Sequence, residues 1–180
     1  SYSYSALSSQ FLESKKLPWG SVPWHVGIFL ILLGHFLAFL VPTAWQSMTA
    51  SKTILYTIEA LGICCTLLAL FGLSVLAFRR LTDSKLQRVT STLDLVIIAL
   101  LLFQVLSGLG IALQYRWGAS WAPGTLSPYL WSLVYLKPDV SFVVDMPGLI
   151  KIHMVGAWLI FLALPFSRLV HVFSLPLQYL

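Results

Sequence analysis

Four long apolar stretches, almost free of charge, constrain this sequence more than any other feature. They run from about 22 to 40, 54 to 78, 93 to 113 and 149 to 173. Each is long enough to cross the roughly 30 Å hydrocarbon core of a bilayer, which takes about 20 helical residues. Backbone polar groups in lipid must be satisfied within their own segment, so helices are expected. We therefore predict an all-α transmembrane bundle of four helices, forming a single domain over residues 1–180.

The composition excludes a water-soluble domain. Charged residues make up 9% of the 180 positions and hydrophobic residues 58%, whereas soluble domains carry about 25% charged residues. The net charge of +5 comes from basic residues between apolar runs, which indicates orientation in a membrane rather than binding of nucleic acid. The first twenty residues lack the apolar core of a signal peptide, so none is expected.

Basic residues indicate which side of the membrane each loop faces. They gather in the N-terminal tail (Lys15, Lys16) and in the loop of residues 79–90 (Arg79, Arg80, Lys85, Arg88). By the positive-inside rule both segments are cytoplasmic, and four crossings then place both ends of the chain inside. The long loop 114–148 faces outward and is rich in Trp and Tyr, which favour the interface. Within it, Pro128–Leu136 is predicted to form a short surface helix.

Local signals place the helix ends. Pro23 suits the first turn of the first helix, where a missing N–H costs little, and Pro42 closes that helix. Thr92 is the expected N-cap of the third helix. Asp94 then lies in the first turn, where the helix dipole favours negative charge.

All four histidines of the chain lie in the predicted spans. His25 and His35 are in the first helix, and His153 and His171 in the fourth. Polar residues at membrane depth are costly and tend to mark function. Antiparallel packing of these two helices would pair His25 with His171 near the inner face and His35 with His153 further out. Each pair could supply two axial imidazoles to a haem iron held between helices.

The spacing of the histidines is only partly regular. Eighteen residues make five turns, so His153 and His171 share a face, while His25 and His35 lie about 80° apart. The rises differ, at about 15 Å and about 27 Å, so tilt or a bend at Pro165 must absorb the difference. Zinc prefers close tetrahedral ligand clusters, so two histidine pairs that lie far apart fit zinc poorly. The adjacent Cys64 and Cys65 are interpreted as helix-packing residues.

Small and basic residues accompany the histidines. Glycines in the spans either let a flat macrocycle approach the backbone or serve ordinary close helix packing; they are Gly27, Gly34, Gly62, Gly72, Gly108, Gly110 and Gly156. Arg79, Arg80 and Arg168 lie at the inner end, where they either pair with haem propionates or anchor helices at the headgroups. The anchor role is favoured for Arg79, and the role of Arg168 stays open.

Several motifs carry a resemblance to a known family. They are Ser8–Leu12, Trp24–Ile28, Gly34–Phe36, His153–Gly156, Pro165–His171 and Pro176–Leu180. In these motifs and in the spacing of all four histidines, most of the chain resembles the cytochrome b (gamma) subunit of respiratory membrane-bound nitrate reductase. That family has five membrane helices, with an additional one before the Ser-Ser-Gln motif. That helix is not found here, which a variant or a trimmed chain would explain.

The resemblance implies a function and its ligands. It implies an inner haem b on His25 and His171 and an outer haem b on His35 and His153. These would carry electrons from a quinol, menaquinol or ubiquinol, to an iron–sulfur beta subunit and a molybdenum alpha subunit that reduces nitrate in anaerobic respiration. The setting would be the cell membrane of a prokaryote.

The resemblance also points to a quinol site, and other functions stay open beside it. Gly34 matches the glycine before the distal histidine of the family's quinol site. Lys52 is the nearest match for its lysine; the other interpretation of Lys52 is an interfacial anchor. The alternative functions are a gamma-like subunit of a sulfite-reducing or heterodisulfide-type complex, a structural membrane anchor, or a transporter using its histidines and Glu59.

Overall fold

The computed structural model describes residues 18–167, and every regular element in that part of the chain is a helix. The elements in order are α1 (Pro18–Leu40), α2 (Pro42–Thr49), α3 (Lys52–Thr82), α4 (Ser84–Arg88), α5 (Thr92–Gln114), α6 (Gly118–Val134), η2 (Val140–Phe142), α7 (Gly148–Ala163) and η3 (Leu164–Phe166). Four of the described helical segments are long and apolar enough to cross a membrane: Trp19–Leu40, Lys52–Thr82, Thr92–Gln114 and Gly148–Phe166. The predicted all-α membrane bundle is confirmed.

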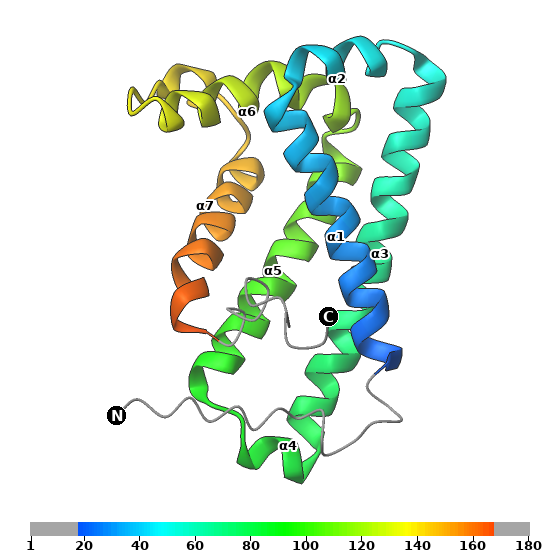
Figure 1. The fold of residues 1–180 in the computed structure, drawn as a ribbon, viewed down its shortest axis with the longest axis vertical. Coiled ribbons are helices and arrows are strands. Elements are labelled where there is room, and N and C mark those ends of the chain that lie inside the picture. Colours follow the sequence, from blue (N-terminus) through cyan, green and yellow to red (C-terminus); the bar gives the residue numbers. More distant parts are fainter. Residues whose placement is uncertain (1–17, 168–180) are drawn as a thin grey trace, which may run out of the picture.

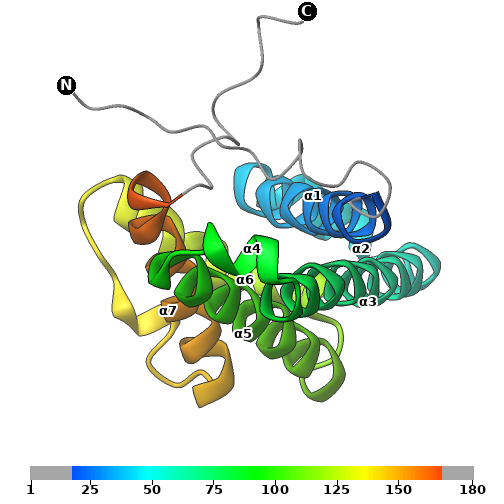
Figure 2. The ribbon, with the colours of Figure 1, turned by 90° about the horizontal axis from the view of Figure 1, so that it is seen from below.

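The four spans pack in the order in which they occur in the chain. Helix α1 packs along α3, α3 also packs against α5, and α5 packs against α7. In both ribbon views α7 lies on one side of α5 and the α1–α3 pair on the other (Figure 1, Figure 2). Helices α1 and α7, which carry the described histidines, form no packed interface with each other within the described residues. Other helices lie between them.

Glycines allow α1 and α3 to approach until their backbones touch. A Cβ on Gly27 would lie 2.6 Å from the carbonyl oxygen of Cys65 and 2.7 Å from the amide nitrogen of Ala69. A Cβ on Gly72 would meet the backbone of Trp24 in the same way. Without a hydrophobic driving force in lipid, such close approach is what holds membrane helices together. Trp24 and Ala69 are accordingly buried together with Leu73 of α3 and Val105 of α5.

Helices α2 and α6 lie across one end of the bundle and form an end cap, while α4 lies at the opposite end (Figure 1). The end cap is fastened by side chains that bond to backbone groups of other helices. In α6, Ser127 donates to the carbonyl of Ala38 at 3.0 Å and Trp131 Nε1 to that of Phe39 at 2.9 Å. In return, Glu59 of α3 accepts the backbone N–H of Ala119 at 2.8 Å.

The surface helix predicted at Pro128–Leu136 exists but begins ten residues earlier, at Gly118. Two prolines, Pro123 and Pro128, lie inside this helix, and each removes a backbone hydrogen-bond donor. The capping bond from Glu59 and the packing of Pro123, which is fully buried, outweigh that local cost.

Two helix starts differ from the sequence prediction. Pro23 is not in the first turn of α1, because the helix already begins at Pro18, itself a good first residue. The N-cap of α5 is Ser91 rather than Thr92. Ser91 Oγ accepts the N–H of Asp94 at 3.2 Å, and the Asp94 carboxylate accepts the N–H of Ser91 at 2.9 Å. This reciprocal capping box needs the acidic residue three positions after the cap, which only Ser91 satisfies.

The fourth span changes character near its proline. Helix α7 ends at Ala163 and passes into the 3-10 turn η3 around Pro165, after which Ser167 has an extended backbone. Proline cannot donate the i to i−4 hydrogen bond, so the α-helix breaks there. The remainder of the span predicted to reach residue 173 lies outside the described residues.

Candidate functional site

His25 and His35 both lie on α1 with exposed side chains. Each turns Nδ1 toward the backbone carbonyl four residues earlier, 2.7 Å from Ser21 O for His25 and 2.8 Å from Ile31 O for His35. A carbonyl oxygen can only accept, so each neutral imidazole carries its proton on Nδ1. The lone pair is then on Nε2, the atom that points away from its own helix backbone.

His153 reaches the same tautomer through α5. Its Nδ1 lies 2.8 Å from Ser107 Oγ, and its Nε2 lies 3.2 Å from the side-chain nitrogen of Gln104. The Gln104 amide nitrogen also donates to the carbonyl of His153 at 3.1 Å, which fixes the orientation of that amide. Because an amide nitrogen only donates, Nε2 of His153 accepts and Nδ1 carries the proton.

The outer histidine pair predicted from topology spans two helices that do not pack together. His35 of α1 and His153 of α7 lie near enough to interact electrostatically. The inner pair cannot be assessed in the same way. His171 lies outside the described residues, as does Arg168, so only His25 of that pair has a place in the fold.

The donor set fits axial ligation of haem iron. All three described imidazoles present an Nε2 lone pair while Nδ1 is bonded to an oxygen, the arrangement in which a histidine binds metal with a supporting second partner. At His153 the fit requires the Gln104 amide to give up its contact with Nε2, and its bond to the His153 carbonyl does not depend on that contact. Within residues 18–167, no three His, Cys, Asp or Glu side chains are grouped as a metal cluster.

The glycines fall into distinct groups. Gly27 and Gly72 serve helix packing, as described above. Gly108 faces the histidine, since a Cβ there would lie 3.1 Å from Cε1 of His153. Gly34 and Gly62 have open space where a side chain would be, with no heavy atom within 4 Å. Close helix packing therefore accounts for Gly27 and Gly72, whereas the approach of a macrocycle to the other glycines stays a prediction.

The two residues predicted for a quinol site lie on different helices. Gly34 immediately precedes His35 on α1, and the space beside it is open. Lys52 is the first residue of α3, is exposed, and makes no side-chain hydrogen bond within the described part of the chain. No hydrogen bond joins the two within the described residues, and their common role stays a prediction.

Sequence reasoning missed Ser107 and Gln104, the two α5 side chains that hold His153. Gln104 carried a signal, because it is the one amide side chain in the largely apolar stretch of residues 95–113. One of the arginines discussed from the sequence has partners here: Arg80 lies 3.9 Å from the Asp94 carboxylate and donates through Nε to Thr90 at 3.1 Å. Arg80 thus joins the ends of α3 and α5.

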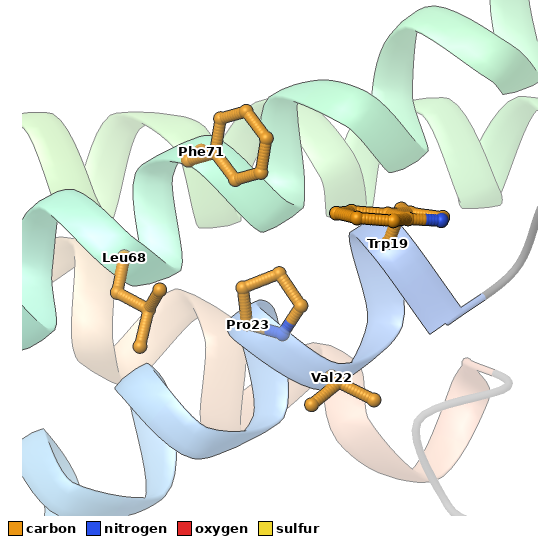
Figure 3. A pocket seen from close by; sticks show the side chains of 5 residues that line it. All are labelled: Trp19, Val22, Pro23, Leu68 and Phe71. Carbon is orange, nitrogen blue, oxygen red and sulfur yellow. The ribbon is translucent and has the colours of Figure 1, made fainter.

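An apolar groove on the outside of the α1–α3 pair is separate from the histidines. Trp19, Val22 and Pro23 of α1 and Leu68 and Phe71 of α3 line it (Figure 3). At about 100° per residue, Pro23 lies about 160° around α1 from His25 and Trp19 about 160° from His35, whereas Val22 lies only about 60° from His25. No histidine lines the groove, so we do not assign it to the candidate site.

Fold and site together define an all-helical, multi-span membrane protein with histidines held at defined positions inside its spans. The chain matches the nitrate reductase gamma subunit family over residues 1–180, and it belongs to that family. It is 33% identical to the nitrate reductase gamma chain of Bacillus subtilis (strain 168), covering 99% of this chain and 82% of that protein. It is also 33% identical to the respiratory nitrate reductase 2 gamma chain of Escherichia coli (strain K12), covering 99% and 80%. The nitrate reductase-like protein NarX of Mycobacterium tuberculosis (strain ATCC 25618 / H37Rv) is 28% identical over 99% of this chain but only 28% of its own length.

Proposed function

We propose that this chain is the membrane dihaem cytochrome b subunit of a respiratory nitrate reductase. It oxidises menaquinol or ubiquinol near the outer face of the cell membrane and delivers the electrons to a cytoplasmic iron–sulfur subunit, which serves a molybdenum catalytic subunit. One observation carries the proposal. The three described histidines all have Nδ1 within hydrogen-bond distance of an oxygen, and two of them, His35 and His153, come from different membrane helices.

In this proposal His25 and His171 hold the inner haem, and His35 and His153 hold the outer one. Haem iron, when bound, supplies reversible one-electron transfer. The chain orients each imidazole through Nδ1, which makes Nε2 a better donor. Its apolar spans exclude water and so help to set the potentials.

The quinol binds beside the outer histidine in this proposal. The open space at Gly34 admits a flat ring next to His35. Lys52, at the α2–α6 end of α3, donates a charged hydrogen bond to a quinol oxygen, which is stronger than a neutral one. The protons leave on that outer side. The basic residues at the α4 end of the bundle, Arg88 of α4 among them, face the cytoplasm by the positive-inside rule, and both ends of the chain are on the same side.

Optical spectra of the purified, dithionite-reduced complex test the haems. We expect b-type absorption and two haems per chain, with one haem lost in His35→Ala and in His153→Ala and the other lost in His25→Ala and in His171→Ala. A chain without bound iron would refute the proposal. A purely structural anchor predicts instead that His35→Ala and His171→Ala assemble and support quinol oxidation normally.

The terminal acceptor is tested separately. Co-purified subunits and reduction of nitrate by membranes supplied with quinol distinguish a nitrate reductase from a related complex. Retention of both haems together with reduction of sulfite or a heterodisulfide, and none of nitrate, would favour the alternative partner.

A further inference from the structure

We propose that Ser107 is a positioning residue that fixes the tautomer of His153 and sets the redox potential of the outer haem. The inference rests on the proposed function, because it requires His153 to be an axial ligand. The hydroxyl of Ser107 is the only described oxygen within hydrogen-bond distance of Nδ1 of His153, at 2.8 Å.

The direction of that hydrogen bond follows from the neighbours of Ser107. Its hydroxyl proton is directed at the Gln104 carbonyl, 3.1 Å away, one turn earlier in α5. An oxygen whose own proton is donated elsewhere can only accept from the imidazole. Ser107 therefore accepts Nδ1–H of His153, which puts the lone pair on Nε2, in agreement with the tautomer argument from Gln104.

His153 differs in this respect from the histidines of α1. His25 and His35 use backbone carbonyls of their own helix, which no substitution removes, and His25 has the Ser21 hydroxyl at 3.2 Å as a second neighbour. His153 depends on a side chain contributed by another helix. A hydroxyl is also a weaker acceptor than a peptide carbonyl, so the outer pair of ligands is electronically unequal.

The site around Ser107 is built to hold one ring position. Ser107 is buried, with 6% of its surface exposed, so water does not replace its hydroxyl. Gly108 allows the ring to lie against α5, and Gln104 bonds the His153 backbone from the same helix. A partner that accepts Nδ1–H increases the electron density on Nε2, which favours ferric iron and lowers the potential.

The competing explanation is that Ser107 is an ordinary packing residue. Serine in a helix often bonds back to a carbonyl three or four residues earlier, and its loss would then only loosen the α5–α7 contact. A measurement of stability does not separate the two explanations, whereas the potential of one haem does.

The experiment is a redox titration of both haems in membranes containing the assembled complex, with ferric electron paramagnetic resonance spectra of the same samples. In Ser107→Ala we expect the outer-haem equilibrium to shift toward ferrous iron by up to about tenfold, or about 59 mV for one electron, and its ferric signal to move. The inner haem should not change. Ser107→Thr, which keeps the hydroxyl, should restore the parent values.

A matched control separates tuning from loosening. Ser127→Ala removes another buried hydroxyl that bonds between helices, 3.0 Å from the Ala38 carbonyl, but touches no histidine. An unchanged outer potential in Ser107→Ala, or an equal shift in Ser127→Ala, would overturn the inference. If Ser107→Ala loses the outer haem, retention by Ser107→Thr supports the inference and loss in both overturns it. Failure of the proposed function is distinguishable, because the parent chain itself would then lack haem.

Discussion

Replacing Gly27 with alanine should force α1 and α3 apart. The added Cβ would lie 2.6 Å from the Cys65 carbonyl oxygen, about 0.8 Å short of the 3.4 Å at which ordinary contact begins. The opposing atoms are backbone, so no side chain can rotate away. A gap of 0.5–1 Å forfeits roughly a quarter to a half of each contact energy across an interface. Overpacking of this kind costs about 1–3 kcal/mol, and about 2 kcal/mol lowers the unfolding midpoint by roughly 4–8 °C in a chain of this size.

The same helix offers the control. Gly34→Ala introduces the same methyl seven residues away, where nothing lies within 4 Å, and should leave the midpoint unchanged. Thermal unfolding in detergent, followed by circular dichroism, compares both variants with the parent. The rate of quinol oxidation, by contrast, should fall in Gly34→Ala, because the added methyl group fills the space beside His35. Equal midpoints for Gly27→Ala and the parent would show that α1 and α3 do not approach so closely.

Three further substitutions test other parts of the fold. Gly108→Ala places a Cβ 3.1 Å from Cε1 of His153 and should destabilise the packing of the ring by about 1 kcal/mol. The measurement is the haem content, which should fall; a parent-like haem content would contradict the ring position. Asp94→Ala removes the capping box of α5 and should cost about 1 kcal/mol of stability, measured as a lower unfolding midpoint. The hydroxyl and then the backbone N–H of Ser141 hold the pKa of Asp139 below its ordinary value of 3.8. The stabilisation is therefore present above pH 3.8 and is lost as the pH falls through the lowered pKa. Ser141→Ala should raise that pKa part of the way back, which carboxyl NMR titration would detect.

The membrane fold is predictable from the sequence because burial in lipid leaves little choice. Four apolar stretches of sufficient length must be helices, and each predicted span has its counterpart. The end cap is only partly predictable. Helix α6 contains two prolines, and what begins it at Gly118 is the carboxylate of Glu59, which is sixty positions away in sequence. No local sequence pattern predicts a contact between residues so far apart in the chain.

The candidate site, like the fold, is predictable from the sequence only in part. Histidine spacing and chain direction predict that His35 and His153 come together, since both quantities are read along the chain. The residues that hold His153 were not predicted, because they depend on the rotation of α5 about its axis. A one-residue change in that rotation would turn Ser107 away by about 100°. The sequence showed that Gln104 is a polar residue in a largely apolar helix, but it did not show that the partner of Gln104 is His153.

The bonds that fasten the end cap have a consequence for biogenesis. The last carbonyls of any helix lack partners within that helix, and at the end of α1 those of Ala38 and Phe39 are satisfied by Ser127 and Trp131 of α6. The ribosome reaches Ser127 89 residues after Ala38, which at ordinary rates takes about 5–20 s. By the time Ser127 is made, the first three spans, up to Gln114, have been synthesised, but until then the two carbonyls at the end of α1 lack these partners. The later half of the chain therefore completes the hydrogen bonding of the earlier half.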